Sequence, residues 1–100
     1  MEQVRNWDMK ARIRLLSTSE GGLKGPLFGD RIGCLFRLGN ETFDCFLQLA
    51  PESKIHPGEE ADVEILFLRP DLVKPKLQIG SSFTLWDYRE VGRGKVLAIH

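Results

Sequence analysis

The fold of this chain is decided by residues 31–49, which read RIGCLFRLGNETFDCFLQL. Apolar and polar residues alternate on both sides of Gly39-Asn40, a pair typical of the two-residue turns, type I′ or II′, that join antiparallel strands. If these two residues form the tip, Phe36 faces Phe43 on the partner strand, and one face of both strands is apolar. The stretch therefore predicts a β-hairpin with a buried face.

The same register places the only two cysteines, Cys34 and Cys45, opposite each other on that face. Their Cα atoms would lie about 5.5 Å apart, as in a hydrogen-bonded pair of an antiparallel ladder. A disulfide is compatible with this separation, but a bridge across such a pair is strained. We expect two reduced thiols that act as small hydrophobic core residues. Because the chain has no C-x-x-C motif, we expect no metal and no cofactor.

Four further stretches alternate apolar and polar residues as strands do: 9–16, 61–69, 82–87 and 91–99. The last of them carries Gly92 and Gly94 on one face, a pattern that marks a sharp bend or a close approach of another backbone. Residues 69–77 hold two prolines and are expected to be a crossover connection. Six short strands without a helix of useful length predict an all-β fold, a six-stranded antiparallel closed β-barrel, since closure removes exposed sheet edges.

Length and composition indicate one small globular domain. The 100 residues are expected to form a polar N-terminal extension over residues 1–8 and a single barrel domain over residues 9–100. Fourteen basic residues balance fourteen acidic ones, which removes the simplest argument for a nucleic-acid partner. No apolar run reaches the roughly 18 residues of a membrane helix, and no signal region opens the chain, so a cytoplasmic protein without a membrane partner is expected.

The sequence contains no pattern of polar residues that would predict a catalytic site. His56 stands beside a proline in a turn and His100 ends the chain, and neither has a nucleophile or metal ligand near it in sequence. Gly92-x-Gly94 is not a dinucleotide fingerprint, because no helix follows and the third glycine is missing. We expect no enzyme activity and no small-molecule substrate.

Several large apolar residues fall on strand faces assigned to solvent. They could be covered by the Gly-rich loop 17–29, or inner and outer faces could exchange near the barrel corners. Alternatively, they form a patch that docks a protein partner or a second copy of the chain, with tryptophan and arginine as its strongest contacts. The candidate protein interface comprises Leu35, Phe46, Leu66, Leu68, Trp86, Arg89 and Arg93.

A basic strand face offers a second possibility. The polar side of residues 9–16 carries three cations in a row, which is either an ordinary solvated face or a stripe that follows phosphates. The candidate RNA contacts are Lys10, Arg12, Arg14, Lys24 and Arg31.

The order of the glycine corners resembles a known family. The motifs are Glu20-Gly21-Gly22, Pro26 and Phe28 followed by Gly29-Asp30-Arg31, Pro57-Gly58-Glu59, Phe83-Thr84-Leu85 with Arg89, and Val91-Gly92-Arg93-Gly94-Lys95-Val96. Together they resemble the C-terminal, third domain of elongation factor Tu and related translational GTPases, over roughly residues 9–99. The resemblance implies a six-stranded antiparallel barrel without catalytic activity of its own.

In that family the domain packs against the GTPase domain, helps to hold the T-arm of aminoacyl-tRNA and offers surface to the exchange factor. The family's Arg-Pro-Gln-Phe stretch is absent here, since Ile32, Gly33 and Cys34 follow Arg31. The resemblance thus implies a translation-factor-like, noncatalytic interaction module that docks a protein, and the candidate partners are another protein ligand, a translation GTPase or a second copy of the chain. The alternative it leaves open is weak binding of tRNA or other RNA.

Overall fold

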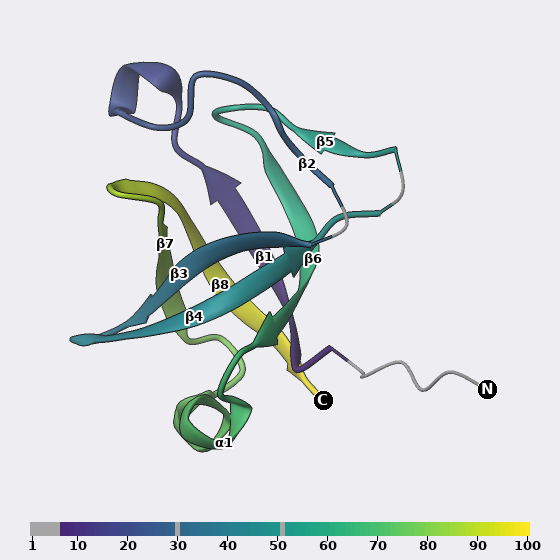
Figure 1. Ribbon diagram of the computed structural model, residues 1–100, viewed down its shortest axis with the longest axis vertical. Helices are drawn as coiled ribbons and strands as arrows, with labels where there is room; N and C mark the ends of the chain where they lie inside the picture. Colours follow the sequence, from purple (N-terminus) through teal and green to yellow (C-terminus); the bar gives the residue numbers. More distant parts are fainter. Residues whose placement is uncertain (1–6, 30, 51) are drawn as a thin grey trace.

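The chain forms a closed β-barrel in the computed structural model, which describes residues 7–29, 31–50 and 52–100 (Figure 1). The barrel strands are β1 (Met9–Leu15), β3 (Ile32–Leu38), β4 (Glu41–Gln48), β6 (Glu60–Phe67), β7 (Ser82–Trp86) and β8 (Glu90–Ile99). They are joined in the order β1-β6-β4-β3-β7-β8, and β8 pairs with β1 to close the barrel. Every neighbouring pair is antiparallel. The expected six-stranded all-β barrel is confirmed.

The β3–β4 hairpin has the register that its alternation predicts. Phe36 faces Phe43, and Cys34 faces Cys45. At the tip Gly39 has a φ of +62°, whereas the residue after it does not have a positive φ, and this combination is a type II′ turn. Both cysteines are free thiols, as expected, with their Sγ atoms 3.3 Å apart. The hairpin therefore turns both sulfurs and one row of apolar side chains to the same side.

Phenylalanine rings fill the middle of the barrel. Phe36 meets Phe67 edge to face, with ring centroids 4.9 Å apart, and stacks on Phe83 with centroids 4.5 Å apart. The three rings come from β3, β6 and β7, and none is more than 4% exposed. Burial of apolar surface contributes about 25 cal/mol per Å², so this ring cluster is a main source of the barrel's stability.

Glycines let two strands approach each other where β1 and β8 close the barrel. Gly94 faces Ile13 in the register of this pair. A Cβ atom at position 94 would lie 2.6 Å from the Cζ atom of Phe83 and 2.8 Å from the backbone oxygen of Arg12. No side chain fits there, so the expected close approach of a second backbone is confirmed.

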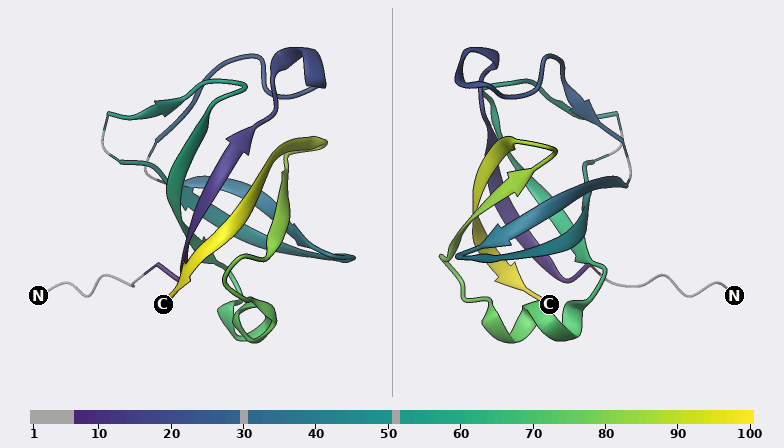
Figure 2. Two further views of the ribbon diagram at one scale, coloured as in Figure 1. Left: turned by 180° about the vertical axis from the view of Figure 1, so that it is seen from behind. Right: turned by 60° about the vertical axis from the view of Figure 1, so that its left-hand side comes forward.

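A second, two-stranded sheet covers one end of the barrel. It pairs β2 (Leu27–Phe28) with β5 (Lys54–Ile55), and η1 (Thr18–Glu20) precedes it (Figure 2). Leu23 and Leu27 pack against the core, as expected of a loop that folds over the barrel end, but Phe28 is 62% exposed. The pairing of β2 with β5 was not expected, because it joins segments far apart in the chain and each supplies only two residues.

The crossover after β6 is partly helical. It contains α1 (Pro70–Val73) and η2 (Lys74–Lys76), which lie beyond the end of the barrel opposite the small sheet (Figures 1 and 2). Val73 and Leu77 are buried against the core. The crossover is confirmed, since its prolines prevent regular strand pairing. Over the described ranges, no helix has the length and apolar character required to cross a membrane.

Of the N-terminal extension expected over residues 1–8, the structure describes only Trp7 and Asp8. Residues 1–6 lie outside the described residues. Asp8 is hydrogen-bonded to the barrel: its N–H donates to the carbonyl of Ile65, and its carboxylate accepts from the N–H of Phe67 at 2.8 Å. Asp8, one residue before β1, is therefore part of the barrel's hydrogen bonding.

Candidate functional site

An apolar hollow of about 500 Å³ lies on the outer face of the barrel, where β3, β4 and β7 meet the end of β6. Four of the expected interface residues line it: Leu35, Phe46, Leu68 and Trp86. We call these four side chains and the space between them the apolar hollow.

Strand register explains why these side chains meet. Leu35 of β3 pairs with Trp86 of β7 on one side and with Asp44 of β4 on the other. Leu68 follows β6 directly, and its N–H donates to the carbonyl of Asp44 at 3.1 Å. One row of residues across the sheet thus runs from Trp86 through Leu35 to Leu68, and side chains in such a row point to the same face.

Polar contacts hold the two aromatic rings in place. The indole Nε1 of Trp86 donates a hydrogen bond to the Oγ1 atom of Thr84 at 2.8 Å. The guanidinium of Arg37 lies over the Trp86 ring, 5.5 Å from its centroid, and that of Arg31 lies over Phe46 at the same distance. Cation–π contacts of this kind stabilise a ring orientation by about 0.5–1 kcal/mol at exposed sites. The apolar hollow is therefore an ordered surface.

Tyr88 stands at the edge of the apolar hollow and is fully exposed. It occupies the turn between β7 and β8 with a φ of +65°, a left-handed conformation that costs a non-glycine residue energy. The turn is closed by a hydrogen bond from the N–H of Asp87 to the carbonyl of Arg89 at 2.8 Å. The fold thus presents a large aromatic side chain beside the hollow without burying it.

Three expected interface residues do not belong to this surface. Leu66 lies opposite Phe46 in the β4–β6 ladder, but it is only 5% exposed. Arg89 donates to the carbonyl of Gly22 in the loop over the barrel end. Arg93 lies in a separate groove, described next. The expectation that these three would contact a partner together with the hollow is therefore not supported by their positions.

Sequence reasoning missed Arg37 and Tyr88. Arg37 reaches Trp86 because it pairs with Thr84, two residues before the tryptophan, across the β3–β7 ladder. No local pattern shows that these distant strands are neighbours. The signal for Tyr88 was its place between two strands in a short turn, where a large aromatic residue is unusual.

A groove of about 610 Å³ lies on another part of the outer face, over β1, β8, β7 and β3. We call it the cationic groove, because among the described residues its lining includes five cations and one carboxylate, that of Glu60. The cations are Arg12, Arg14, Arg37, Arg93 and Lys95. Arg37 lies between the two sites, since it also stacks on Trp86.

The cationic groove gathers only two of the five expected RNA contacts, Arg12 and Arg14. Lys10 is exposed on the same strand but does not line the groove, and Lys24 and Arg31 lie elsewhere. The basic face of β1 is confirmed as solvent-facing. Most of its cationic neighbours come from β8 and β3, which sequence reasoning could not place beside it.

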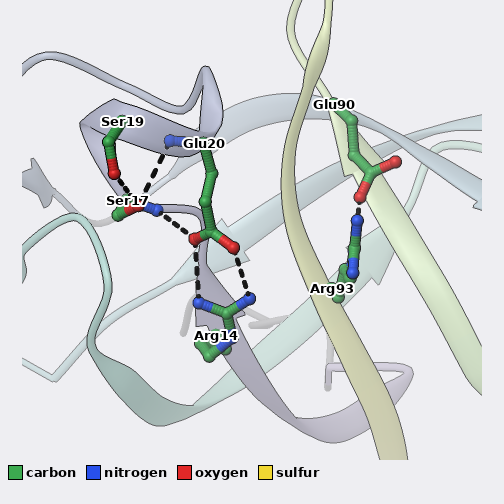
Figure 3. Close-up of polar contacts among 6 residues, drawn as sticks. All are labelled: Arg14, Ser17, Ser19, Glu20, Glu90 and Arg93. Carbon is green, nitrogen blue, oxygen red and sulfur yellow. Dashed lines mark hydrogen bonds and ion pairs between the residues drawn. The ribbon is translucent and has the colours of Figure 1, made fainter.

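Carboxylates neutralise three of the groove's cations, and Figure 3 shows two of these pairs, Arg14 with Glu20 and Arg93 with Glu90. Arg12 pairs with Asp62 at 2.8 Å, Arg14 with Glu20 at 3.1 Å, and Arg93 with Glu90 at 2.6 Å. The hydrogen bond from Arg12 lowers the pKa of Asp62. Over the described residues, Lys95 and Arg37 have no carboxylate partner. Among the groove's cations, these two are therefore the ones whose charge is available to a bound ligand.

The carboxylate of Glu20 is the most strongly perturbed of these acids. Both guanidinium nitrogens of Arg14 donate to it, and the N–H of Ser17 donates at 2.8 Å, as Figure 3 shows. These bonds, that of Arg14 first, lower the pKa of Glu20 from 4.5 to about 2. The ionised form is therefore favoured by folding.

We predict a pH-dependent effect of Glu20→Gln. Because the folded pKa lies below the unfolded one, the stabilisation by Glu20 is complete above about pH 4.5 and disappears as the pH falls to about 2. The melting temperature of the variant should be lower than that of the native protein at pH 7, and the gap should close by pH 2. Thermal unfolding followed by circular dichroism at several pH values measures it. A gap that is the same at pH 7 and pH 2 would contradict this role.

The histidines are held by ordinary surface pairs. The Nδ1 atom of His56 lies 3.1 Å from Glu59, and the Nε2 atom of His100 lies 3.2 Å from Glu64. No group of three or more potential metal ligands occurs in the part of the chain that the structure describes. The apolar hollow and the cationic groove are thus the candidate binding sites of this protein.

No known protein-family model matches this sequence, and a search of curated proteins finds no significant match. The kinship with the third domain of elongation factor Tu stays a prediction from the motifs.

Proposed function

We propose that this protein is a noncatalytic interaction module that docks a protein partner through the apolar hollow. The observation that carries the proposal is the convergence of Leu35, Phe46 and Trp86, from three strands, with Leu68, which follows a fourth, into one hollow of about 500 Å³. Leu35 and Leu68 are 38% and 57% exposed. Grouped exposed apolar side chains are typical of protein-binding surfaces, whereas scattered ones are not.

The composition of the hollow also supports a protein ligand. One side of it is a partly buried tryptophan with an arginine over its ring, and these two residue types dominate the energetics of protein interfaces. The stacked guanidinium of Arg37 keeps its donor groups available for a partner's carboxylate or carbonyl. The expected ligand therefore inserts an apolar side chain beside Trp86 and places an acceptor near Arg37.

The resemblance suggests two partners for this surface, a translation GTPase and a second copy of the chain. The unbonded thiols fit the reducing cytoplasm that we also propose as its location. The RNA-binding alternative has less support, because Arg12 and Arg14 are paired with acids and the other three expected contacts do not join them.

The test uses a double variant, Leu35→Thr with Leu68→Asp, which removes the apolar character of the hollow while keeping a strand-compatible residue in β3. Affinity capture from the native host's lysate, compared with the unchanged protein, should lose its protein partner by tenfold or more, since a truncated hot spot commonly costs about 2 kcal/mol. If the partner is a second copy of the chain, sedimentation of the purified protein should show self-association that the double variant loses.

Ile79→Asp is the matched control, because Ile79 is 71% exposed and does not line the hollow. It should retain the partner in full. Circular dichroism establishes that both variants fold. The docking proposal fails if the folded double variant captures the same partner as the control, or if no protein is captured and the chain is monomeric.

A further inference from the structure

The cationic groove holds like charges at positions where a sheet normally avoids them. In the β1–β8 ladder Arg12 lies directly opposite Lys95, and Arg14 lies directly opposite Arg93. Like charges at directly opposed positions destabilise a sheet. The carboxylates of Asp62, Glu20 and Glu90 offset part of this repulsion, and a bound anion would offset what remains at Lys95.

The register extends this arrangement into two rows across the sheet. Beyond β8, the β7 strand places Ser82 opposite Lys95 and Thr84 opposite Arg93, and Arg37 of β3 follows beside Thr84. Neighbouring strands lie about 4.8 Å apart, so successive side chains in a row are within reach of one small ligand. Each row thus combines cationic donors with one hydroxyl, as suits an anion with several oxygens.

Carboxylates limit the length of that ligand. On the far side of β1, the outer face of β6 carries Glu60 opposite Arg14 and Asp62 opposite Arg12. Glu90 pairs with Arg93 at another edge. A long polyanion that left the groove across β6 would meet these acids, whereas a compact one would meet only Glu60 among the lining residues.

The apolar lining gives no platform for bases. Phe83 is the one aromatic residue in the lining, and it is 4% exposed because its ring points into the core. Proteins that bind single-stranded nucleic acids combine a cationic groove with exposed stacking rings. The groove therefore suits phosphate groups rather than unpaired bases.

We propose that the cationic groove binds a compact anion with two or more linked phosphates, with Lys95 and Arg37 as its direct contacts and the hydroxyls of Ser82 and Thr84 as further donors. Lys95 and Arg37 have no carboxylate partner over the described residues, so they bind without first losing an ion pair. Arg93 and Arg14 also line the groove, but Glu90 and Glu20 offset their charge. This site shares only Arg37 with the docking proposal, and the Leu35→Thr with Leu68→Asp variant that tests docking leaves the groove lining unchanged.

Inorganic tripolyphosphate is the probe, titrated calorimetrically into the full chain at low salt, about 50 mM. We expect saturable binding that weakens as salt is added. Lys95→Gln should weaken it by about tenfold. Glu60→Gln should strengthen it several-fold, because it removes the lining carboxylate. Lys10→Gln should leave it unchanged, since Lys10 is an exposed cation of β1 outside the groove.

Titrations with ATP and with single-stranded homopolymeric RNA identify the source of the phosphates. Equal affinity for ATP and tripolyphosphate supports recognition of the phosphate chain alone, and tighter binding of ATP supports a nucleoside triphosphate as the ligand. The proposal is overturned if tripolyphosphate does not bind, if Lys95→Gln and Lys10→Gln bind it equally, or if single-stranded homopolymeric RNA binds and tripolyphosphate does not.

Discussion

Gly94→Ala is expected to destabilise the barrel by about 3 kcal/mol, at the upper end of the usual range for adding a methyl group to a packed interior. The new Cβ atom would lie 2.6 Å from the Cζ atom of Phe83, 2.8 Å from the backbone oxygen of Arg12 and 2.9 Å from the Cγ2 atom of Ile13. The backbone oxygen belongs to β1 at the seam that closes the barrel, so it cannot move without disturbing the β1–β8 ladder.

Chemical denaturation followed by circular dichroism measures this loss, and the melting temperature should fall by roughly 15 °C, at 4–8 °C per kcal/mol for a domain of this size. Gly25→Ala is the matched control, because a Cβ atom there meets nothing within 4 Å. That variant should be neutral or slightly stabilised, as a loop glycine is replaced without strain. Equal stability of the two variants would show that the strands do not close as tightly as described.

Phe36→Ala should lose about 4 kcal/mol of stability, within the 3–5 kcal/mol range for truncation of a buried phenylalanine. Phe36 is fully buried and contacts two other rings, stacking on Phe83 and meeting Phe67 edge to face. Removing it opens a cavity at the centre of the ring cluster, and strands on all sides of the barrel line that cavity. A domain of this size has little stability beyond that loss, so much of the variant is expected to be unfolded at 37 °C.

Phe28→Ala is the control for this second variant, because Phe28 is 62% exposed and lies in the small sheet. Its loss of stability should stay within about 0.5 kcal/mol. The comparison is made by urea denaturation with both variants at the same temperature. A loss for Phe36→Ala no larger than that for Phe28→Ala would place the core elsewhere.

Local sequence patterns predicted the barrel because its strands are short, regular and separated by strong turn signals. The Gly39-Asn40 turn and the alternation around it specify the β3–β4 register without help from other strands, since a slip by one residue would turn Phe36 to solvent. The missed elements are those without local signals. The β2–β5 pair is stabilised by contact with a distant segment, and its two-residue strands carry no period that a pattern could reveal.

The candidate sites also divide into features that local sequence patterns predict and features that depend on distant strands. Alternation along each strand correctly assigned Leu35, Leu68 and Trp86 to the outer face, but it could not tell which outward residues are covered, and Leu66 is covered. The cationic groove shows the limit more strongly, because four of its five cations lie on β1 and β8, strands at opposite ends of the sequence.

The amino-acid sequence by itself determined which strand faces are apolar and where the chain turns, because these follow from side-chain period and backbone conformation within a few neighbouring residues. Only the tertiary structure decided which outward residues share a surface. That choice depends on the strand order β1-β6-β4-β3-β7-β8, and pairing between distant strands is set by packing of the whole barrel rather than by any local pattern.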